Sequence, residues 1–118
     1  MSVLGEILSI LPDIEKGRWR KKSDFYTLFT VLAKQVRLFP LSREGRVRCR
    51  ELLHEFATGV DAYLSDTLRR GEGIPMPVKE YAGAVERAAS DLANRTKREE
   101  MLEFWLRSVI EAEAAARG

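Results

Sequence analysis

The sequence predicts an all-α fold, a single-domain bundle of four to five helices. Apolar residues recur with helical spacing, as in Val3, Leu4, Ile7, Leu8 and Leu11, and strand-like alternation persists nowhere. The chain has 118 residues, which suits one domain of ordinary size. Its composition, 45% hydrophobic and 32% charged, is typical of a globular protein rather than a disordered one. We therefore expect one core formed by packed helices.

The chain is expected to divide into a short first helix, a bundle and a tail. The first helix lies within residues 1–15, where Ser2 can cap its start and Pro12 disfavours its continuation. A helix of this length is marginal by itself, so it should dock on the rest of the chain. Residues 16–110 are expected to form the bundle, and the alanine-rich residues 111–118 to form a helical tail that frays.

The second and third helices have recognisable starts. Ser23 is a suitable N-cap for the second helix, which should end at Phe39-Pro40. Its apolar stripe is wide, so most of its circumference should be buried. The third helix is expected to run from Ser42 to residue 70. Gly59 lies inside it and costs about 1 kcal/mol relative to alanine, which predicts a bend or a close helix contact there.

Residues 71–77, rich in glycine and proline, form the clearest loop in the sequence. A fourth helix begins at the end of this loop, and its small residues, among them Ala88 and Ala89, permit a close approach to a neighbour. The polar residues 94–96 predict a break. The apolar spacing of residues 101–110 then predicts a fifth helix.

The composition also bears on compartment and cofactors. Cys49 is the one cysteine, so no internal disulfide is expected and a reducing, cytoplasmic location is the natural prediction. No apolar run approaches the roughly 20 residues that span a bilayer, and Glu6 interrupts the apolar N-terminal stretch, so we expect no membrane contact and no signal peptide. His54 is the one histidine, which leaves too few ligands for a zinc site. No metal or other cofactor is expected.

The net charge of +2 conceals a strong asymmetry. Residues 16–50 contain eleven lysines and arginines against two carboxylates, a local balance of +9, so the rest of the chain carries −7. Basic side chains can neutralise phosphates, and an interleaved tryptophan can stack on a base. The predicted nucleic-acid contacts are Arg18, Trp19, Arg20, Lys21, Lys22, Arg43, Arg46 and Arg50. The alternative is a solvated basic face that pairs with the acidic remainder of the molecule. The sequence has no helix-turn-helix or zinc-finger pattern that would indicate sequence-specific reading.

Arg48 and His54 suggest an enzymatic alternative. Five residues separate them, which matches the loose R-x(4–6)-H pattern of HEPN-type ribonucleases, helical dimers that cleave RNA without metal. A neutral histidine could take the proton of a 2′-hydroxyl, and the arginine could stabilise the charge that develops on phosphorus. Such a pair also arises easily in an arginine-rich segment, and His54 can equally lie at the edge of the core. An enzyme is therefore the less favoured reading.

Asp91, Arg95 and Arg98 form a second candidate site for an anion. Asp91 and Arg95 are four residues apart, and Arg98 continues the same helical face. The arginines could reach an anionic ligand while Asp91 orients one of them. The alternative is pairing on the helix surface, worth a few tenths of a kcal/mol.

A resemblance to a known family starts in the second helix. Residues 21–29, Lys-Lys-Ser-Asp-Phe-Tyr-Thr-Leu-Phe, are followed by Leu41-Ser42 and a long helix, and then by Tyr81 ahead of Asp91, Arg95 and Arg98. From about Arg18 to Ile110 this pattern resembles the helical second half of ParB-like defence proteins of the GmrSD and SspE types. In those proteins the first half carries a D-G-Q-Q-R motif and handles nucleotides during DNA restriction.

The resemblance implies a helical module that docks on a ParB-like domain and helps to present a phosphate-bearing substrate in phage defence. The D-G-Q-Q-R motif, a preceding sheet and the H-x-x-P nuclease motif are missing from these 118 residues. The module would therefore not hydrolyse nucleotide by itself. Our expectation is a non-catalytic accessory domain that contacts DNA or another anionic partner. A protein-interaction module that forms a homodimer through the apolar first helix is a further alternative.

Overall fold

The computed structural model describes residues 2–65, 71–87 and 91–117, and over these residues the fold is all-α, as predicted. Three short 3₁₀ turns, η1 (Ile14–Lys16), η2 (Arg18–Arg20) and η3 (Val36–Leu38), lie among the helices. None of the described helices is long and apolar enough to cross a membrane. The helices are α1 (Val3–Ile10), α2 (Lys22–Ala33), α3 (Arg43–Ser65), α4 (Met76–Glu86), α5 (Leu92–Trp105) and α6 (Arg107–Arg117).

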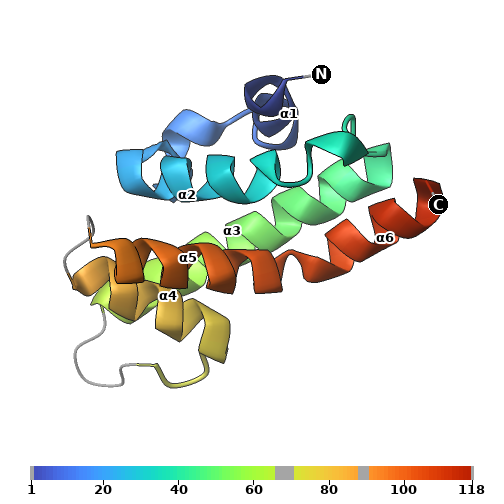
Figure 1. The fold of residues 1–118 in the computed structure, drawn as a ribbon. Helices are drawn as coiled ribbons and strands as arrows, with labels where there is room; N and C mark the ends of the chain where they lie inside the picture. Colours follow the sequence, from blue (N-terminus) through green and yellow to red (C-terminus); the bar gives the residue numbers. More distant parts are fainter. Residues whose placement is uncertain (1, 66–70, 88–90, 118) are drawn as a thin grey trace.

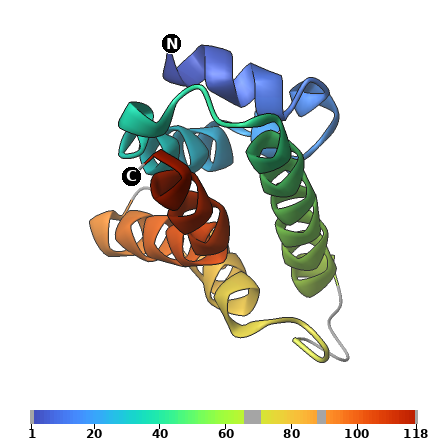
Figure 2. The same cartoon turned by 90° about the vertical axis from the view of Figure 1, so that its right-hand side faces the viewer.

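The helices surround one core. Figure 1 shows α5 and α6 following one another along the length of the molecule, with α2 and α1 on one side of them and α4 on the other. Figure 2 shows α3 facing the α5–α6 pair across the molecule. Phe56 of α3 lies between these layers, and its ring centroid is 6.1 Å from that of Trp19, 4.9 Å from Tyr81 and 5.6 Å from Trp105. Aromatic rings from four segments thus define the centre of the bundle.

The first helix docks on the bundle, as its length required. Ser2 caps it, and its hydroxyl oxygen accepts a hydrogen bond from the Gly5 amide at 2.9 Å. The inner face contacts α2 and α3 and buries Ile7 and Ile10 completely. This face is covered by the chain itself, whereas Leu4 and Leu8 of the same predicted apolar stripe are exposed.

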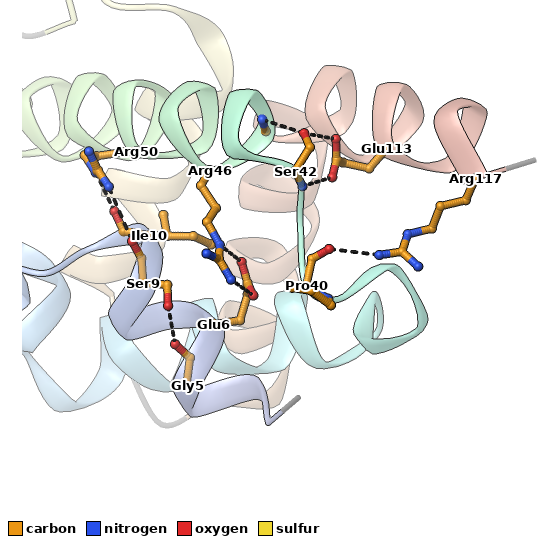
Figure 3. A network of polar contacts seen from close by, with 11 residues as sticks. Gly5, Glu6, Ser9, Ile10, Pro40, Ser42, Arg46, Arg50, Glu113 and Arg117 are labelled. Atoms are coloured by element: carbon orange, nitrogen blue, oxygen red, sulfur yellow. Dashed lines mark hydrogen bonds and ion pairs between the residues drawn. The ribbon is translucent and has the colours of Figure 1, made fainter.

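Polar contacts from α3 hold α1 in place (Figure 3). Arg46 donates two hydrogen bonds to the carboxylate of Glu6, from Nε at 2.7 Å and from Nη2 at 2.9 Å. Glu6 is fully buried. Arg50 donates from Nε to the carbonyl oxygen of Ile10 at 2.6 Å, which satisfies a carbonyl at the end of α1. The Arg46 guanidinium beside Glu6 has its pKa raised, chiefly by their hydrogen bonds, so the guanidinium keeps its charge.

Gly59 marks a close helix contact, one of the two predicted possibilities. A Cβ atom at this position would lie 2.8 Å from Cγ1 of Val78, a buried and stiff β-branched residue on α4. Helix α3 continues through Gly59 as one helix. The glycine therefore lets α3 and α4 approach each other.

Several predicted boundaries are wrong. The described residues form six helices, because Leu106 leaves the helical conformation and separates α5 from α6. No break occurs at residues 94–96, because Asp91 caps α5 and the helix runs through them. Helix α2 begins at Lys22, and Ser23 lies in its first turn rather than at the cap.

The described part of the predicted helical tail, residues 111–117, lies in α6. Glu113 is buried and accepts hydrogen bonds from the backbone amide of Ser42 at 2.6 Å and from its hydroxyl at 2.7 Å (Figure 3). Its carboxylate thereby lies at the N-terminus of α3, where a negative charge is favourable. The predicted end of the third helix at residues 66–70 and the predicted small residues Ala88 and Ala89 lie outside the described residues.

Gly59→Ala should destabilise the fold by about 1–2 kcal/mol, since overpacking against Val78 outweighs the better helix propensity of alanine. Urea unfolding would show a lower midpoint with an unchanged slope. Gly17→Ala is the matched control: a Cβ atom added at Gly17 would have nothing within 4 Å, and the backbone there is extended. Equal stability of the Gly59 variant and wild type would contradict the close contact.

Arg46→Met should cost about 3 kcal/mol, because it leaves the Glu6 carboxylate buried without its cation. The double variant Glu6→Leu/Arg46→Met should recover most of this loss, since it removes both charges together. Arg43→Met, an exposed position on the same helix, serves as the control. Chemical denaturation of these three variants and of the single variant Glu6→Leu measures the coupling, and additive effects of the Glu6 and Arg46 substitutions would show that the pair contributes nothing.

Candidate functional site

Arg18 and Trp19, predicted to contact nucleic acid, lie in the interior. Arg18 donates from Nη1 to Asp24 at 3.0 Å and from Nε to Asp61 at 2.8 Å. Trp19 is 2% exposed, and its indole N–H donates to the carbonyl oxygen of Leu53 at 3.1 Å. The prediction of an exposed basic surface is therefore wrong for these two residues, because each has a structural partner.

Arg46 and Arg50 are also committed to internal contacts, since both bind α1 as described above. The remaining four predicted contacts, Arg20, Lys21, Lys22 and Arg43, are exposed, and no ion pair joins them to a carboxylate of the described residues. They do not form one surface. Figure 1 places the start of α3, where Arg43 lies, at the opposite end of the molecule from the start of α2.

We call Arg20, Lys21 and Lys22 the basic corner. These exposed residues connect η2 to the first residue of α2. Lys21 occupies the N-cap position of α2, where no side chain forms a capping hydrogen bond. Lysine is a poor cap, and cations are unfavourable beside the positive end of a helix dipole. This corner thus presents positive charge and uncapped amide groups together.

Arg48 and His54 do not converge within one copy of the chain. Six positions along a helix place them about 120° apart around the axis of α3. Arg48 lies 3.9 Å from Glu51 and lines a hollow between α3 and α6. His54 is exposed and lines a different hollow, beside η1 and η2. The arrangement within one chain thus does not support the ribonuclease alternative.

The hollow beside His54 has a volume of about 330 Å³. The charged residues that line it are two acidic residues, Asp13 and Asp61, and two basic residues, Lys16 and Arg18. The carboxylate of Asp61 is already paired with Arg18 at 2.6 Å. No group of three or more possible metal ligands occurs in the described part of the chain. The hollow therefore offers neither a metal site nor an excess of one charge.

Asp24 is the centre of a buried polar cluster that the sequence did not reveal. It accepts hydrogen bonds from Arg18 and from the hydroxyl of Tyr81, and all three side chains are buried. Burial, together with the charge of Asp24, raises the pKa of Tyr81 well above its ordinary value, so the hydroxyl keeps its proton. Burial alone would lower the pKa of Arg18, but Asp61 and Asp24 more than offset that effect.

Arg98 adjoins this cluster and is 2% exposed. Its positive charge opposes part of the rise in the pKa of Tyr81. Neither Nε nor Nη1 of Arg98 has a hydrogen-bond partner among the described residues, and neither has Nε of Arg95. A buried donor without an acceptor costs about 1–3 kcal/mol, which makes this the least satisfied place in the described fold.

Asp91 does not orient either arginine, contrary to the predicted arrangement. Its carboxylate caps α5 and accepts hydrogen bonds from the amides of Ala93 at 2.8 Å and Asn94 at 3.3 Å. The common face of Arg95 and Arg98 is confirmed, because both lie on α5 three residues apart. The two arginines therefore remain candidates for an anionic ligand, without the carboxylate assigned to them.

Tyr81→Phe should lower the free energy of unfolding by about 1–3 kcal/mol, because it removes one donor from the buried Asp24. It should also change the alkaline limb of the stability curve. Above about pH 10 the unfolded chain loses the tyrosine proton while the folded chain keeps it, so wild-type stability falls as pH rises. Urea unfolding between pH 8 and about pH 11 should show a shallower fall in the variant. Tyr26→Phe, at an exposed position, is the control, and identical slopes for Tyr81→Phe and wild type would contradict this assignment.

Comparisons with known proteins leave the family open. The chain matches no family model, no curated protein and no solved structure. The resemblance to ParB-like defence proteins thus stays a prediction based on the residues that carry it. What the chain does has to be inferred from its own contacts, burial and charge.

Proposed function

We propose that this chain is a non-catalytic helical interaction domain that contacts a nucleic-acid backbone through the basic corner. The observation that carries the proposal is the set of three consecutive exposed cations, Arg20, Lys21 and Lys22, at the uncapped start of α2. A phosphate placed there would meet the cations and the free amide groups of the helix together. The docking role in phage defence implied by the family resemblance is compatible with this contact.

The basic corner contradicts the usual chemistry of a helix start. Capping residues and negative charges stabilise that position, and Asp24, the acidic residue in the first turn, is buried and bound to Arg18 and Tyr81. Places where a sequence departs from such local preferences are often functional sites. An external anion would supply the negative charge that α2 lacks at its solvent-facing start.

The partner should be bound weakly and without sequence preference. The basic corner has three exposed cations, and Trp19, the residue predicted to stack on a base, is buried. Phosphate contacts position a protein on nucleic acid but carry no sequence information. The domain would therefore add affinity to a larger assembly rather than select a site.

The test is a fluorescence anisotropy titration of a labelled DNA duplex at about 50 mM and about 200 mM KCl. Three phosphate contacts predict that wild-type Kd rises about 40-fold over this fourfold change in salt. The triple variant Arg20→Gln/Lys21→Gln/Lys22→Gln should bind at least about tenfold more weakly at the lower salt and show little salt dependence.

A charge-matched control separates the basic corner from general electrostatics. Arg37→Gln/Arg43→Gln/Lys97→Gln removes three exposed cations from η3, α3 and α5. This variant should bind the duplex within about threefold of wild type. Equal losses in the two triple variants, or no binding by wild type at the lower salt, would overturn the proposal.

A further inference from the structure

We propose that Arg98 and Arg95 form a site for a compact oxyanion, a phosphate monoester or a carboxylate, on the inner face of α5. Helix α5 packs against both α2 and α4. Arg98 is 2% exposed, and its Nε and Nη1 atoms have no acceptor among the described residues. The Nε atom of Arg95, one turn earlier on the same face, is also buried and also lacks a hydrogen-bond acceptor.

The neighbouring carboxylate is already engaged. One oxygen of Asp24 accepts from Tyr81 and the other accepts from Arg18. The titratable and polar groups of this cluster are Asp24 and Thr27 from α2, Tyr81 from α4 and Arg18 from η2. Both oxygens of Asp24 are therefore engaged, and Arg18 is paired with Asp24 and Asp61. A bound oxyanion would supply the acceptors that Nε and Nη1 of Arg98 lack.

Burial limits the ligand to a small terminal group. Arg95 is half-buried and lies about 4.5 Å along the helix axis from the buried Arg98, so the two guanidinium groups can bind one small anion together. The backbone of a duplex cannot follow so deep a position. The chemistry shared by a phosphate monoester and a carboxylate, a compact group with several acceptor oxygens, suits guanidinium donors. This site is thus distinct from the basic corner and does not rest on the proposed function.

The experiment uses inorganic phosphate and acetate as probes, each titrated at constant ionic strength against chloride. Wild-type Tm should rise by about 5 °C at a phosphate concentration tenfold above Kd, and phosphorus NMR should report the same Kd by line broadening. A larger effect of acetate than of phosphate would assign the site to carboxylates. The opposite order would assign it to phosphate monoesters.

Two variants and a control locate the effect. Arg98→Met should abolish the anion-dependent rise, and without the anion its Tm should equal or exceed that of wild type, because it removes two buried donors that have no acceptor. A merely structural arginine would instead lower Tm. Arg95→Gln, at a half-buried position, should weaken binding about tenfold. Lys97→Gln, exposed on the same helix, should leave the Kd unchanged.

Two outcomes would overturn the proposal. One is that neither probe shifts Tm or broadens the phosphorus signal more than chloride does. The other is that the shift persists in both Arg98→Met and Arg95→Gln. Duplex binding by Arg98→Met, measured in parallel, should match that of wild type, so failure here is distinguishable from failure of the basic corner.

Discussion

The pairing of buried carboxylates with basic groups is the constraint on which the arrangement of this domain depends. Glu6 on α1 and Asp24 on α2 point inward, and each requires a cation because an unpaired buried charge is costly. Arg46 and Arg18 supply those cations. Arg18, Arg46 and Arg50 are therefore engaged inside the fold, although the other eight basic residues between positions 16 and 50 are exposed.

The all-α class, the Ser2 cap, the Gly59 contact and the loop before α4 could be predicted, because local spacing and residue chemistry determine them. The partners of the arginines could not be predicted. Arg46 pairs with a residue 40 positions away and Arg18 with one 43 positions away, and no local pattern encodes such partners. One signal was present: Glu6 interrupts an apolar stripe, and a charge on a buried face implies a partner elsewhere.

The candidate sites use two kinds of basic residue. Those of the basic corner are exposed, so they are suited to an extended anion that is bound weakly and with little selectivity. Arg98 is buried, so it is suited to a small anion that can be enclosed. The sequence placed Arg95 and Arg98 on one face because helical spacing fixes that relation. It assigned Asp91 to them wrongly, since capping chemistry and ion pairing both use a nearby carboxylate.

The contact between Glu113 and the start of α3 links three helices into one cooperative unit. Glu113 holds Ser42 at the first turn of α3, one turn before Arg46, and Arg46 holds Glu6 of α1 (Figure 3). Opening of α6 would fray the turn of α3 that carries Arg46. The hydrogen bonds from Arg46 to Glu6, which hold α1 in place, would then be lost. Local opening at the C-terminal helix should thus propagate to the N-terminal one, and amides of both would exchange with solvent as a single foldon.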